Sequence, residues 1–360
     1  MKGPGAKNIL FFLLVPVLFF AGLETAARLL AAPPEDPVMG RPAAAITAEG
    51  LPALAEILAY DPVLFWRLAP NLAGKRVAGR IGNYPVDFTV STNGDGARLV
   101  SEAPEKTCGT AQSPKRRECT RRILVLGDSA SFGLGVSDAE AWPSLLDAMI
   151  VEKRGSGWGV CNMAVPGHTA FQGTRYLEER GEALRPYVVI AGFWANDKAS
   201  WMGASDLQTM RMVERWEANR WFFERCRLAW AMNGLYRSLQ PEPQARPRLN
   251  EAEFLGCLES MAAWGREHET PVAFLVWPSR VQIAEKQEEL HGYQALVAKA
   301  AKAADAVLIN PAPRFIQAGG DLFVDDYHGN AAGCALAADA VWEALEPVLE
   351  KRQLLEGPWK

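Results

Sequence analysis

The sequence lacks the motifs of the common cofactor-dependent and metal-dependent enzymes. It contains no phosphate-binding Gly-x-x-x-x-Gly-Lys loop, no Gly-x-Gly-x-x-Gly dinucleotide fingerprint and no His-Glu-x-x-His zinc motif. Its six cysteines include no Cys-x-x-Cys pair, which argues against a cysteine-rich zinc site. The Gly-x-Ser-x-Gly elbow of the α/β-hydrolases is also incomplete, because Ser131 stands where the second glycine is required.

Neither sign of charge dominates the chain. The formal net charge is −4 over 360 residues, which argues weakly against a polyanionic partner such as nucleic acid. Charged residues make up 22% and hydrophobic residues 49% of the chain, which fits one large folded domain with appendages, or two domains. A basic run at 115–117 is interpreted as part of a solvated loop.

Charge is absent from the segment 9–23, which follows Lys2 and Lys7. Two interpretations are open. A cleaved signal peptide needs small residues after the apolar core, and 25–27 offers a poor site. An uncleaved signal-anchor needs about 20 mostly apolar residues, and 9–32 provides them if its charges lie at the interface. We favour the anchor and predict a transmembrane helix within 1–32, with the lysines in the cytoplasm and the remainder across the membrane.

The cysteines fit an oxidising compartment. Cys108 and Cys119 bracket a short polar loop and are candidates for a disulfide. The other four are interpreted as a weaker candidate pair, Cys226 and Cys257, and as two buried thiols, Cys161 and Cys334.

Residues 33–120 are predicted to form a linker and a small β-rich appendage. A short helical stretch is expected at 51–59. The segments 65–68 and 86–90 look like strands, the second with alternating apolar and polar residues. Asn-Gly-Asp-Gly at 93–96 is a strong turn signal.

Residues 121–350 alternate between buried strands and helices. The apolar run 123–126 predicts a strand that is covered on both faces. Four more strands are predicted at 160–165, 187–193, 272–277 and 306–309, with helices at 140–151, 171–184, 251–267, 287–304 and 331–349. The alternation predicts an α/β fold with a parallel, doubly wound, five-stranded sheet.

One segment, 200–250, interrupts this alternation. It is rich in aromatic residues, methionine and arginine, and it predicts one or two helices inserted after the third strand. Its aromatic side chains either pack on the domain or form a lid or substrate platform above a site. We favour simple packing.

Polar side chains with catalytic potential follow several predicted strands. In an open α/β sheet, ligands bind at the carboxyl ends of the strands. The segments at these positions are Gly127-Asp128-Ser129, Pro166-Gly167-His168 and Ala195-Asn196-Asp197, with Asp325-Asp326-Tyr327-His328 ahead of the last helix.

These segments supply the parts that acyl transfer requires. A serine nucleophile needs a histidine to take its proton and an acid to hold that histidine in the right tautomer. Asp325 and His328 are three residues apart, so one helical turn places them side by side. The amides of Ser129 and Gly167 and the side chain of Asn196 are candidate donors to the oxyanion.

In their order along the chain, these segments resemble the conserved blocks of the SGNH hydrolases, also called the GDSL family of lipases, esterases and acetyltransferases. The resemblance covers roughly residues 121–350. It implies a flavodoxin-like three-layer α/β/α sandwich, a catalytic triad and an oxyanion hole, with no metal and no cofactor. The triad would be Ser129, His328 and Asp325, and the oxyanion hole Ser129, Gly167 and Asn196.

One position departs from the family pattern. The third block is normally Gly-x-Asn-Asp, whereas this chain has Trp194-Ala195-Asn196-Asp197. We expect Trp194 to line the substrate pocket, together with Asp128, and either to crowd it or to displace Asn196. The remaining candidates are interpreted as non-catalytic neighbours or structural residues: His168, His268, His291, Asp326 and Asp197.

The leading hypothesis is a serine ester hydrolase that acts on an acyl ester or acylated glycan in the cell envelope. The anchor and appendage resemble those of exported bacterial proteins, which implies a single-pass inner-membrane protein with its catalytic domain in the periplasm. Secretion after signal cleavage is the alternative. Two other functions stay open: a polysaccharide O-acetyltransferase with the same triad, and a non-catalytic accessory subunit of an envelope complex. Protein partners are not predicted.

Overall fold

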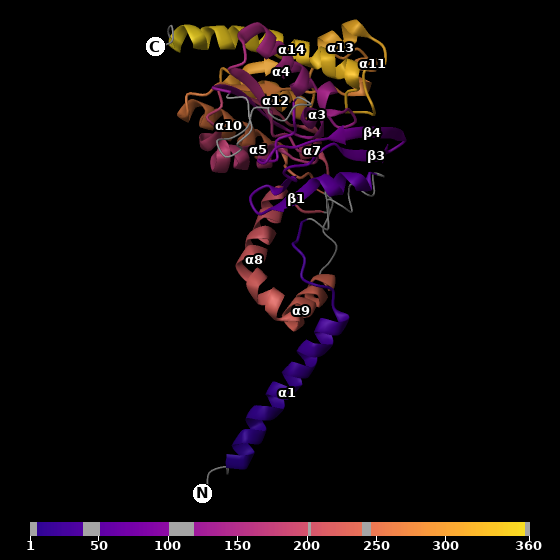
Figure 1. Cartoon of the computed structure of the whole chain (residues 1–360), viewed down its shortest axis with the longest axis vertical. Helices are drawn as coiled ribbons and strands as arrows, with labels where there is room; N and C mark the ends of the chain where they lie inside the picture. The colour runs from indigo at the N-terminus through magenta and orange to yellow at the C-terminus, as the bar shows by residue number, and fades with distance from the viewer. Residues whose placement is uncertain (1–5, 39–50, 101–118, 201–202, 240–245, 357–360) are drawn as a thin grey trace.

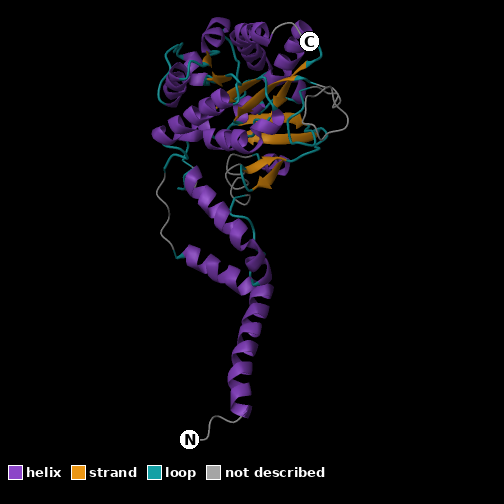
Figure 2. Cartoon of the chain, turned by 90° about the vertical axis from the view of Figure 1, so that its left-hand side faces the viewer, coloured by secondary structure: helices purple, strands orange, loops and turns teal. Residues whose placement is uncertain are grey.

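The computed structural model describes residues 6–38, 51–100, 119–200, 203–239 and 246–356. A main body holds the sheet, and a helical stalk extends from it toward the N-terminus (Figures 1 and 2). The stalk contains helix α1 (Ala6–Leu30) and the two helices of the insertion, α8 (Asp206–Arg225) and α9 (Arg227–Ser238).

The body is built on a parallel sheet of five strands, as the sequence predicts. The strands are β5 (Arg121–Gly127), β6 (Trp158–Asn162), β7 (Val188–Gly192), β8 (Val272–Leu275) and β9 (Val307–Ile309). Their order across the sheet is β6-β5-β7-β8-β9, and each neighbouring pair is parallel. The strands β6, β7 and β8 are buried at every residue, because helices cover the sheet.

The helices that flank the sheet form two groups. One contains α4 (Trp142–Arg154) and α14 (Ala331–Glu356), which pack on each other. The other contains α5 (Ala170–Tyr176), α10 (Glu251–Glu267) and α12 (Tyr293–Ala303), with α10 in contact with both of its neighbours. Helix α12 begins later than the predicted 287–304, because the chain turns at Gly292, where φ is +54°.

The N-terminal appendage forms two antiparallel hairpins. The strands are β1 (Leu58–Asp61), β2 (Phe65–Leu68), β3 (Lys75–Ile81) and β4 (Tyr84–Val90). The helix predicted at 51–59 is a single 3-10 helix, η1 (Pro52–Ile57), which runs directly into β1. The apolar side chains of the appendage join the same core as the central sheet.

A buried arginine joins the appendage to the central sheet. The backbone of Arg98 bridges Asn162 of β6, and its side chain is fully buried. All five of its N–H groups have acceptors: the carboxylate of Asp138 at 2.9 Å and the carbonyls of Thr89, Phe132, Gly133 and Val136. This role could not be predicted from the sequence, because an isolated arginine is normally solvated.

Helix α1 covers most of the predicted transmembrane segment, but the transmembrane prediction is not supported. No helix in the described part of the chain combines the length and the apolar character needed to cross a bilayer. The side chains of residues 6–13 lie outside that part. Glu24 and Arg28 form an ion pair of 2.7 Å, and the Glu24 carboxylate also accepts hydrogen bonds from the first amides of α9.

The cysteine predictions have different outcomes. Cys108 lies outside the described residues, so its disulfide with Cys119 stays a prediction. Cys226 and Cys257 are free thiols, so the weaker candidate pair is wrong. Cys161 and Cys334 are buried, as predicted.

Candidate active site

Ser129 lies at the sharp turn that follows strand β5. It begins the short helix α3 (Ser129–Phe132), and Asp128 caps this helix by accepting a hydrogen bond of 2.9 Å from the Ala130 amide. Gly127 allows the turn, because a Cβ at this position would lie 2.2 Å from Ser131 Oγ and 2.7 Å from the carbonyl oxygen of Gly192. The turn therefore brings Ser129 to the carboxyl end of the sheet.

His328 contacts both Ser129 and Asp325. Its Nε2 lies 2.7 Å from Ser129 Oγ, and its Nδ1 lies 2.6 Å from Asp325 Oδ2. The predicted spacing of Asp325 and His328 thus places them side by side. These two contacts let His328 take the proton of Ser129 while the Asp325 carboxylate fixes the tautomer of the histidine ring.

Asp325 is held as a carboxylate. Burial by itself would raise the pKa of Asp325, but the hydrogen bond and charge of His328 and two backbone amides lower it below its ordinary value. These amides, of Tyr327 and His328, donate to Asp325 Oδ1 at 2.8 and 2.7 Å. A carboxylate with both oxygens occupied has a fixed position relative to the histidine ring.

The two other predicted oxyanion residues face the same cavity as Ser129. Gly167 adopts φ +82°, and a Cβ there would approach the Trp66 ring to 3.0 Å. A side chain at position 167 would therefore be strained as well as crowded. The amide nitrogen Nδ2 of Asn196 donates to the carbonyl oxygen of His168 at 3.0 Å. This bond ties the Asn196 side chain to the Gly167 loop.

Trp194 does not line the cavity, contrary to our expectation. It is 6% exposed, and its indole N–H donates to the carbonyl oxygen of Trp277 at 3.0 Å. The Tyr327 ring packs edge-on against it at 5.8 Å, and Lys198 Nζ lies 4.7 Å from its ring centre. Trp194 therefore supports the pocket wall from behind. Its backbone φ of 175° is extended, so the absence of glycine causes no strain.

Asp128 does not line the cavity either. It is buried beneath the Ser129 turn, where its carboxylate serves as the helix cap. Burial raises the pKa of Asp128 to about 6, against the opposing effect of the amide hydrogen bonds and of His328. Asp128 therefore stabilises the turn that carries Ser129.

The cavity around Ser129 has a volume of about 680 Å³. One wall comes from the appendage, a contribution that the sequence did not indicate. The lining residues from this region are Leu54, Trp66, Ile81, Gly82, Asn83 and Tyr84. From the described residues of the insertion, only Ser200 and Arg248 line the cavity, near its two ends, so α8 and α9 do not form a lid over it.

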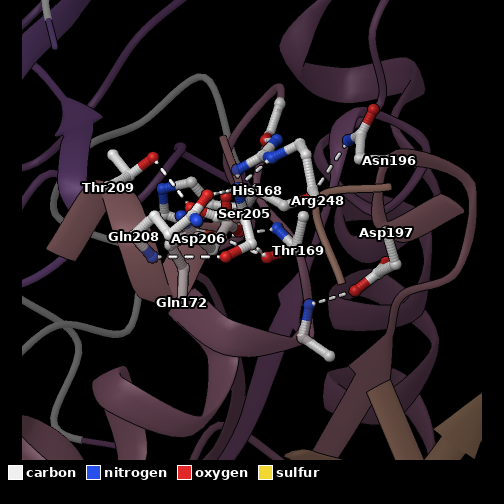
Figure 3. A network of polar contacts seen from close by, with 12 residues as sticks. His168, Thr169, Gln172, Asn196, Asp197, Ser205, Asp206, Gln208, Thr209 and Arg248 are labelled. Atoms are coloured by element: carbon white, nitrogen blue, oxygen red, sulfur yellow. Dashed lines mark hydrogen bonds and ion pairs between the residues drawn. The ribbon is translucent and has the colours of Figure 1, made fainter. Parts of the chain in front are cut away.

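A buried polar network holds the loop that carries Gly167 (Figure 3). The Arg248 guanidinium binds both carboxylate oxygens of Asp206, at 2.9 and 3.0 Å, and donates to the carbonyl oxygen of Gly167. Thr169 Oγ1 donates to Asp206 at 2.5 Å. The first residue of α8 and Arg248, which follows α9, are thereby joined to the Gly167 loop.

Asp197 supports the same loop and is shielded from solvent. Its Oδ1 accepts a hydrogen bond of 2.7 Å from the Ala170 amide (Figure 3). Its Oδ2 is buried and has no hydrogen-bond partner among the described residues. Burial raises the pKa of Asp197 to about 8, so the group is mainly protonated at neutral pH. This geometry matches the structural part expected for Asp197.

The other candidate residues lie outside the Ser129–His328 contact. His168 is buried with Nε2 2.8 Å from the Trp66 carbonyl oxygen, and burial lowers its pKa to about 3. His268 stacks on Trp264, and His291 is exposed. Asp326 is exposed at the rim of the cavity. In the described part of the chain, no group of three or more His, Cys, Asp or Glu residues could hold a metal ion.

Comparison with known proteins identifies the catalytic body. The model of a family described as the GDSL-like Lipase/Acylhydrolase family matches residues 125–336, which is more than half of the chain. The matched region contains Ser129, Asp325 and His328. No curated protein matches the chain.

Several solved structures are similar to the body. The crystal structure of TesA has 18% sequence identity and a TM-score of 0.43, over 63% of this chain and 99% of that one. The psychrotrophic esterase EstA from Pseudoalteromonas sp. has 17% identity and a TM-score of 0.41, over 64% and 99%. A catalytic mutant of Axe2, an acetylxylan esterase from Geobacillus stearothermophilus, has 14% identity and a TM-score of 0.42, over 63% and 94%.

Proposed function

The chain belongs to the GDSL-like lipase/acylhydrolase family and is an ester-hydrolysing enzyme, and on that premise we propose that it forms a covalent acyl-enzyme on Ser129. The observation that carries the proposal is the unbroken contact from Asp325 through His328 to Ser129, with distances of 2.6 and 2.7 Å. This contact also favours an enzyme over the non-catalytic accessory subunit, which would need none of it.

In the first half of the reaction, His328 Nε2 takes the proton of Ser129 Oγ as the oxygen attacks the ester carbonyl. Asp325 stabilises the positive charge that develops on the ring and keeps Nδ1 protonated. His328 then gives the proton to the departing alkoxide, so that the alcohol leaves and the acyl group stays on Ser129. In the second half, water attacks the acyl carbonyl with His328 again as base, and His328 returns the proton to Ser129 Oγ as the carbon–oxygen bond to Ser129 breaks and the acid leaves.

The negative charge of the tetrahedral intermediate needs donors that are already in place. We assign this role to the amides of Ser129 and Gly167 and to the side chain of Asn196. Asn196 Nδ2 donates one of its two hydrogens to the His168 carbonyl oxygen, which leaves the second to donate to the oxyanion. The Gly167 amide is held by the Arg248 contact to the same residue.

An acyl ester is the proposed substrate, and the cavity supports one with a sizeable alcohol or acyl part. A volume of about 680 Å³ exceeds what a two-carbon acyl group needs. Its walls combine the aromatic rings of Trp66, Tyr84 and Tyr327 with polar side chains. The acylated glycan suggested by the sequence would suit such walls, because sugar rings pack on aromatic faces through their C–H groups.

The catalytic assignment is tested with the full chain and a chromogenic acetyl ester. We expect hydrolysis by the native enzyme and its loss in Ser129→Ala. The matched control is Ser131→Ala, which removes a buried serine two residues away whose hydroxyl makes only a 3.4 Å contact to the Gly192 carbonyl oxygen. Hydrolysis that survives Ser129→Ala, or that disappears equally in both variants, would contradict the assignment.

The compartment is also a proposal, and it is supported by the sequence alone. The two lysines ahead of the uncharged run 9–23 are typical of a segment that directs export across the bacterial inner membrane. Intact-mass analysis of the mature protein after cell fractionation distinguishes the outcomes. A periplasmic chain that retains residues 1–32 fits an anchor, a shortened one fits a cleaved signal, and a full-length cytoplasmic chain contradicts export.

A further inference from the structure

The helical insertion forms an elbow that takes no part in the active site. Helix α8 runs from the body to the elbow, and α9 turns back from it; both views place the elbow well away from the sheet (Figures 1 and 2). Neither helix contributes a residue to the lining of the cavity around Ser129. The elbow therefore requires an explanation other than substrate binding.

The elbow exposes large apolar side chains, which we call the elbow surface. Its members are Trp221 and Phe222 of α8, Met232, Leu235 and Tyr236 of α9, and Leu239 just beyond α9. The last four follow the spacing i, i+3, i+4, i+7 of a single helix face and are between 62% and 74% exposed. A contiguous apolar face of this kind marks an interaction site.

The elbow surface is held in place by a second set of aromatic side chains. The ring of Trp230 lies 5.6 Å from that of Trp216 and 5.6 Å from that of Phe223. Trp216 is buried and joins α8 to α9 through this contact. The packed cluster accounts for the inner side of the elbow, so the outer apolar face is not needed to hold the two helices together.

Arginine outnumbers glutamate in the segment that carries the elbow surface. Residues 207–239 contain six arginines and three glutamates, in a chain whose net charge is −4. The Arg225 guanidinium lies 4.4 Å from the ring centre of Trp221. Tryptophan, tyrosine and arginine on one apolar face are typical of helices that lie at the level of lipid headgroups, where aromatic rings enter the acyl boundary and guanidinium groups meet phosphate.

Helix α1 continues the apolar surface from the same point. The Glu24 carboxylate accepts hydrogen bonds from the amides of Arg227 and Leu228 at 2.9 and 2.8 Å, and Arg28 donates to the Arg225 carbonyl oxygen at 2.5 Å. Beyond this junction α1 runs away from the body (Figure 1). On the N-terminal side of the junction, its exposed large apolar side chains include Leu14, Val15, Val17, Leu18, Phe19, Phe20 and Leu23.

We propose that the elbow surface docks into the headgroup layer of a bilayer that contains anionic lipids. The elbow lies at the surface of the bilayer and does not cross it. The apolar side chains of α8 and α9 enter the boundary between headgroups and acyl chains, and the arginines bind lipid phosphates. A lipid surface fits better than a protein partner because the segment carries an excess of arginine, with Arg225 beside Trp221, and adjoins a second exposed apolar helix.

The proposal is tested by photocrosslinking of the full chain in vesicles of phosphatidylethanolamine and phosphatidylglycerol. The variants Trp221→benzoylphenylalanine and Leu235→benzoylphenylalanine carry the crosslinker at the elbow surface. The matched control is Val281→benzoylphenylalanine, which replaces an exposed apolar residue on the catalytic body. After irradiation, we expect lipid adducts at positions 221 and 235 and none at 281. Ester hydrolysis at the native rate shows that each variant is folded.

The position of the adducts separates docking by the elbow from attachment by α1 alone. If α1 alone holds the chain at the vesicle, positions 221 and 235 give no more lipid adduct than position 281, and the proposal fails. Adducts to protein instead of lipid also overturn it, in favour of a protein partner. A second arm uses Arg225→Gln, combined with crosslinking from Leu235. We expect adduct yield to fall about fivefold on anionic vesicles and not on neutral ones, because one arginine is lost at the charged surface.

Discussion

Arg248 and Asp206 form a buried ion pair that joins the base of the helical insertion to the loop carrying Gly167. Two nitrogens of the guanidinium meet the two carboxylate oxygens at 2.9 and 3.0 Å, and a third donates to the Gly167 carbonyl oxygen. The base of the insertion thus fixes the Gly167 loop, whereas helices α8 and α9 contribute nothing to the cavity lining in the described part of the chain.

Replacement of Arg248 by glutamine should lower kcat more than it raises KM. The Gly167 amide is proposed to bind the oxyanion, which exists only in the transition state and intermediate, so a displaced loop weakens that interaction selectively. We expect kcat to fall roughly 10²-fold, as measured by steady-state hydrolysis of a chromogenic ester. Arg246→Gln is the control, because Arg246 makes only a long 3.9 Å contact to Glu253. Equal kcat values in the two variants would refute the positioning role.

Arg98 should be among the most costly residues to remove. Its replacement by alanine leaves Asp138 and four carbonyl groups without their buried donor. We expect the free energy of unfolding in urea to fall by about 3–5 kcal/mol. Arg76→Ala, which breaks an exposed pair with Asp87, should cost about 1 kcal/mol or less. Similar losses in both variants would show that the Arg98 network contributes little.

Asp197 should make the enzyme less stable as the pH rises. Burial raises the pKa of Asp197 in the folded chain to about 8, from its ordinary value of 3.8. Between these values the folded state keeps a proton that the unfolded state has released, so the free energy of unfolding falls with increasing pH and levels off above about 8. The variant Asp197→Asn cannot ionise and should lack this part of the pH dependence.

Urea unfolding of the native chain and of Asp197→Asn at several pH values measures the difference. The advantage of the asparagine variant should grow from pH 4 to pH 8 by at most about 1.4 kcal/mol per pH unit. A difference between the two proteins that is independent of pH would mean that Asp197 is ionised in the fold at neutral pH.

Tyr84 should determine how tightly the alcohol or acyl part of a large substrate is held. It lies at the tip of the β3–β4 hairpin, lines the cavity and packs against the Arg280 guanidinium at 5.3 Å. Tyr84→Ala should raise KM for a bulky ester about tenfold, through the loss of roughly 1.5 kcal/mol of apolar contact, with kcat for a small acetyl ester unchanged. Tyr84→Phe keeps the ring and should leave both values near native. If alanine has no effect on either substrate, the hairpin does not contact the substrate.

The features of this protein that the sequence predicts correctly are those set by a local pattern of residues. The apolar run before Gly127 predicted a buried strand, and the three-residue spacing predicted that Asp325 and His328 lie side by side. They do so, although a series of bends and not the expected helical turn brings them together. Both features follow from backbone geometry and short-range contacts, so they needed no knowledge of the tertiary fold.

The parts that the sequence could not predict depend on contacts between distant segments. Tyr84 reaches the cavity only because the appendage packs against the sheet. No local sequence pattern around position 84 predicts that this residue lines a pocket. Trp194 was expected in the pocket because it replaces a glycine of the family, whereas its indole lies behind the wall on the Trp277 carbonyl oxygen. In the sequence, Arg98 and Arg248 cannot be distinguished from solvated arginines, because their buried partners, Asp138 and Asp206, lie far away along the chain.

The central claim is that Ser129 is the nucleophile and that His328 activates it. The most direct measurement is labelling of the full chain with a fluorophosphonate, followed by peptide mass spectrometry to locate the adduct. We predict a single phosphonyl adduct on Ser129 in the native enzyme and almost none in His328→Gln, since the serine then lacks its base. An adduct on another residue, or undiminished labelling of Ser129 in His328→Gln, would contradict the account.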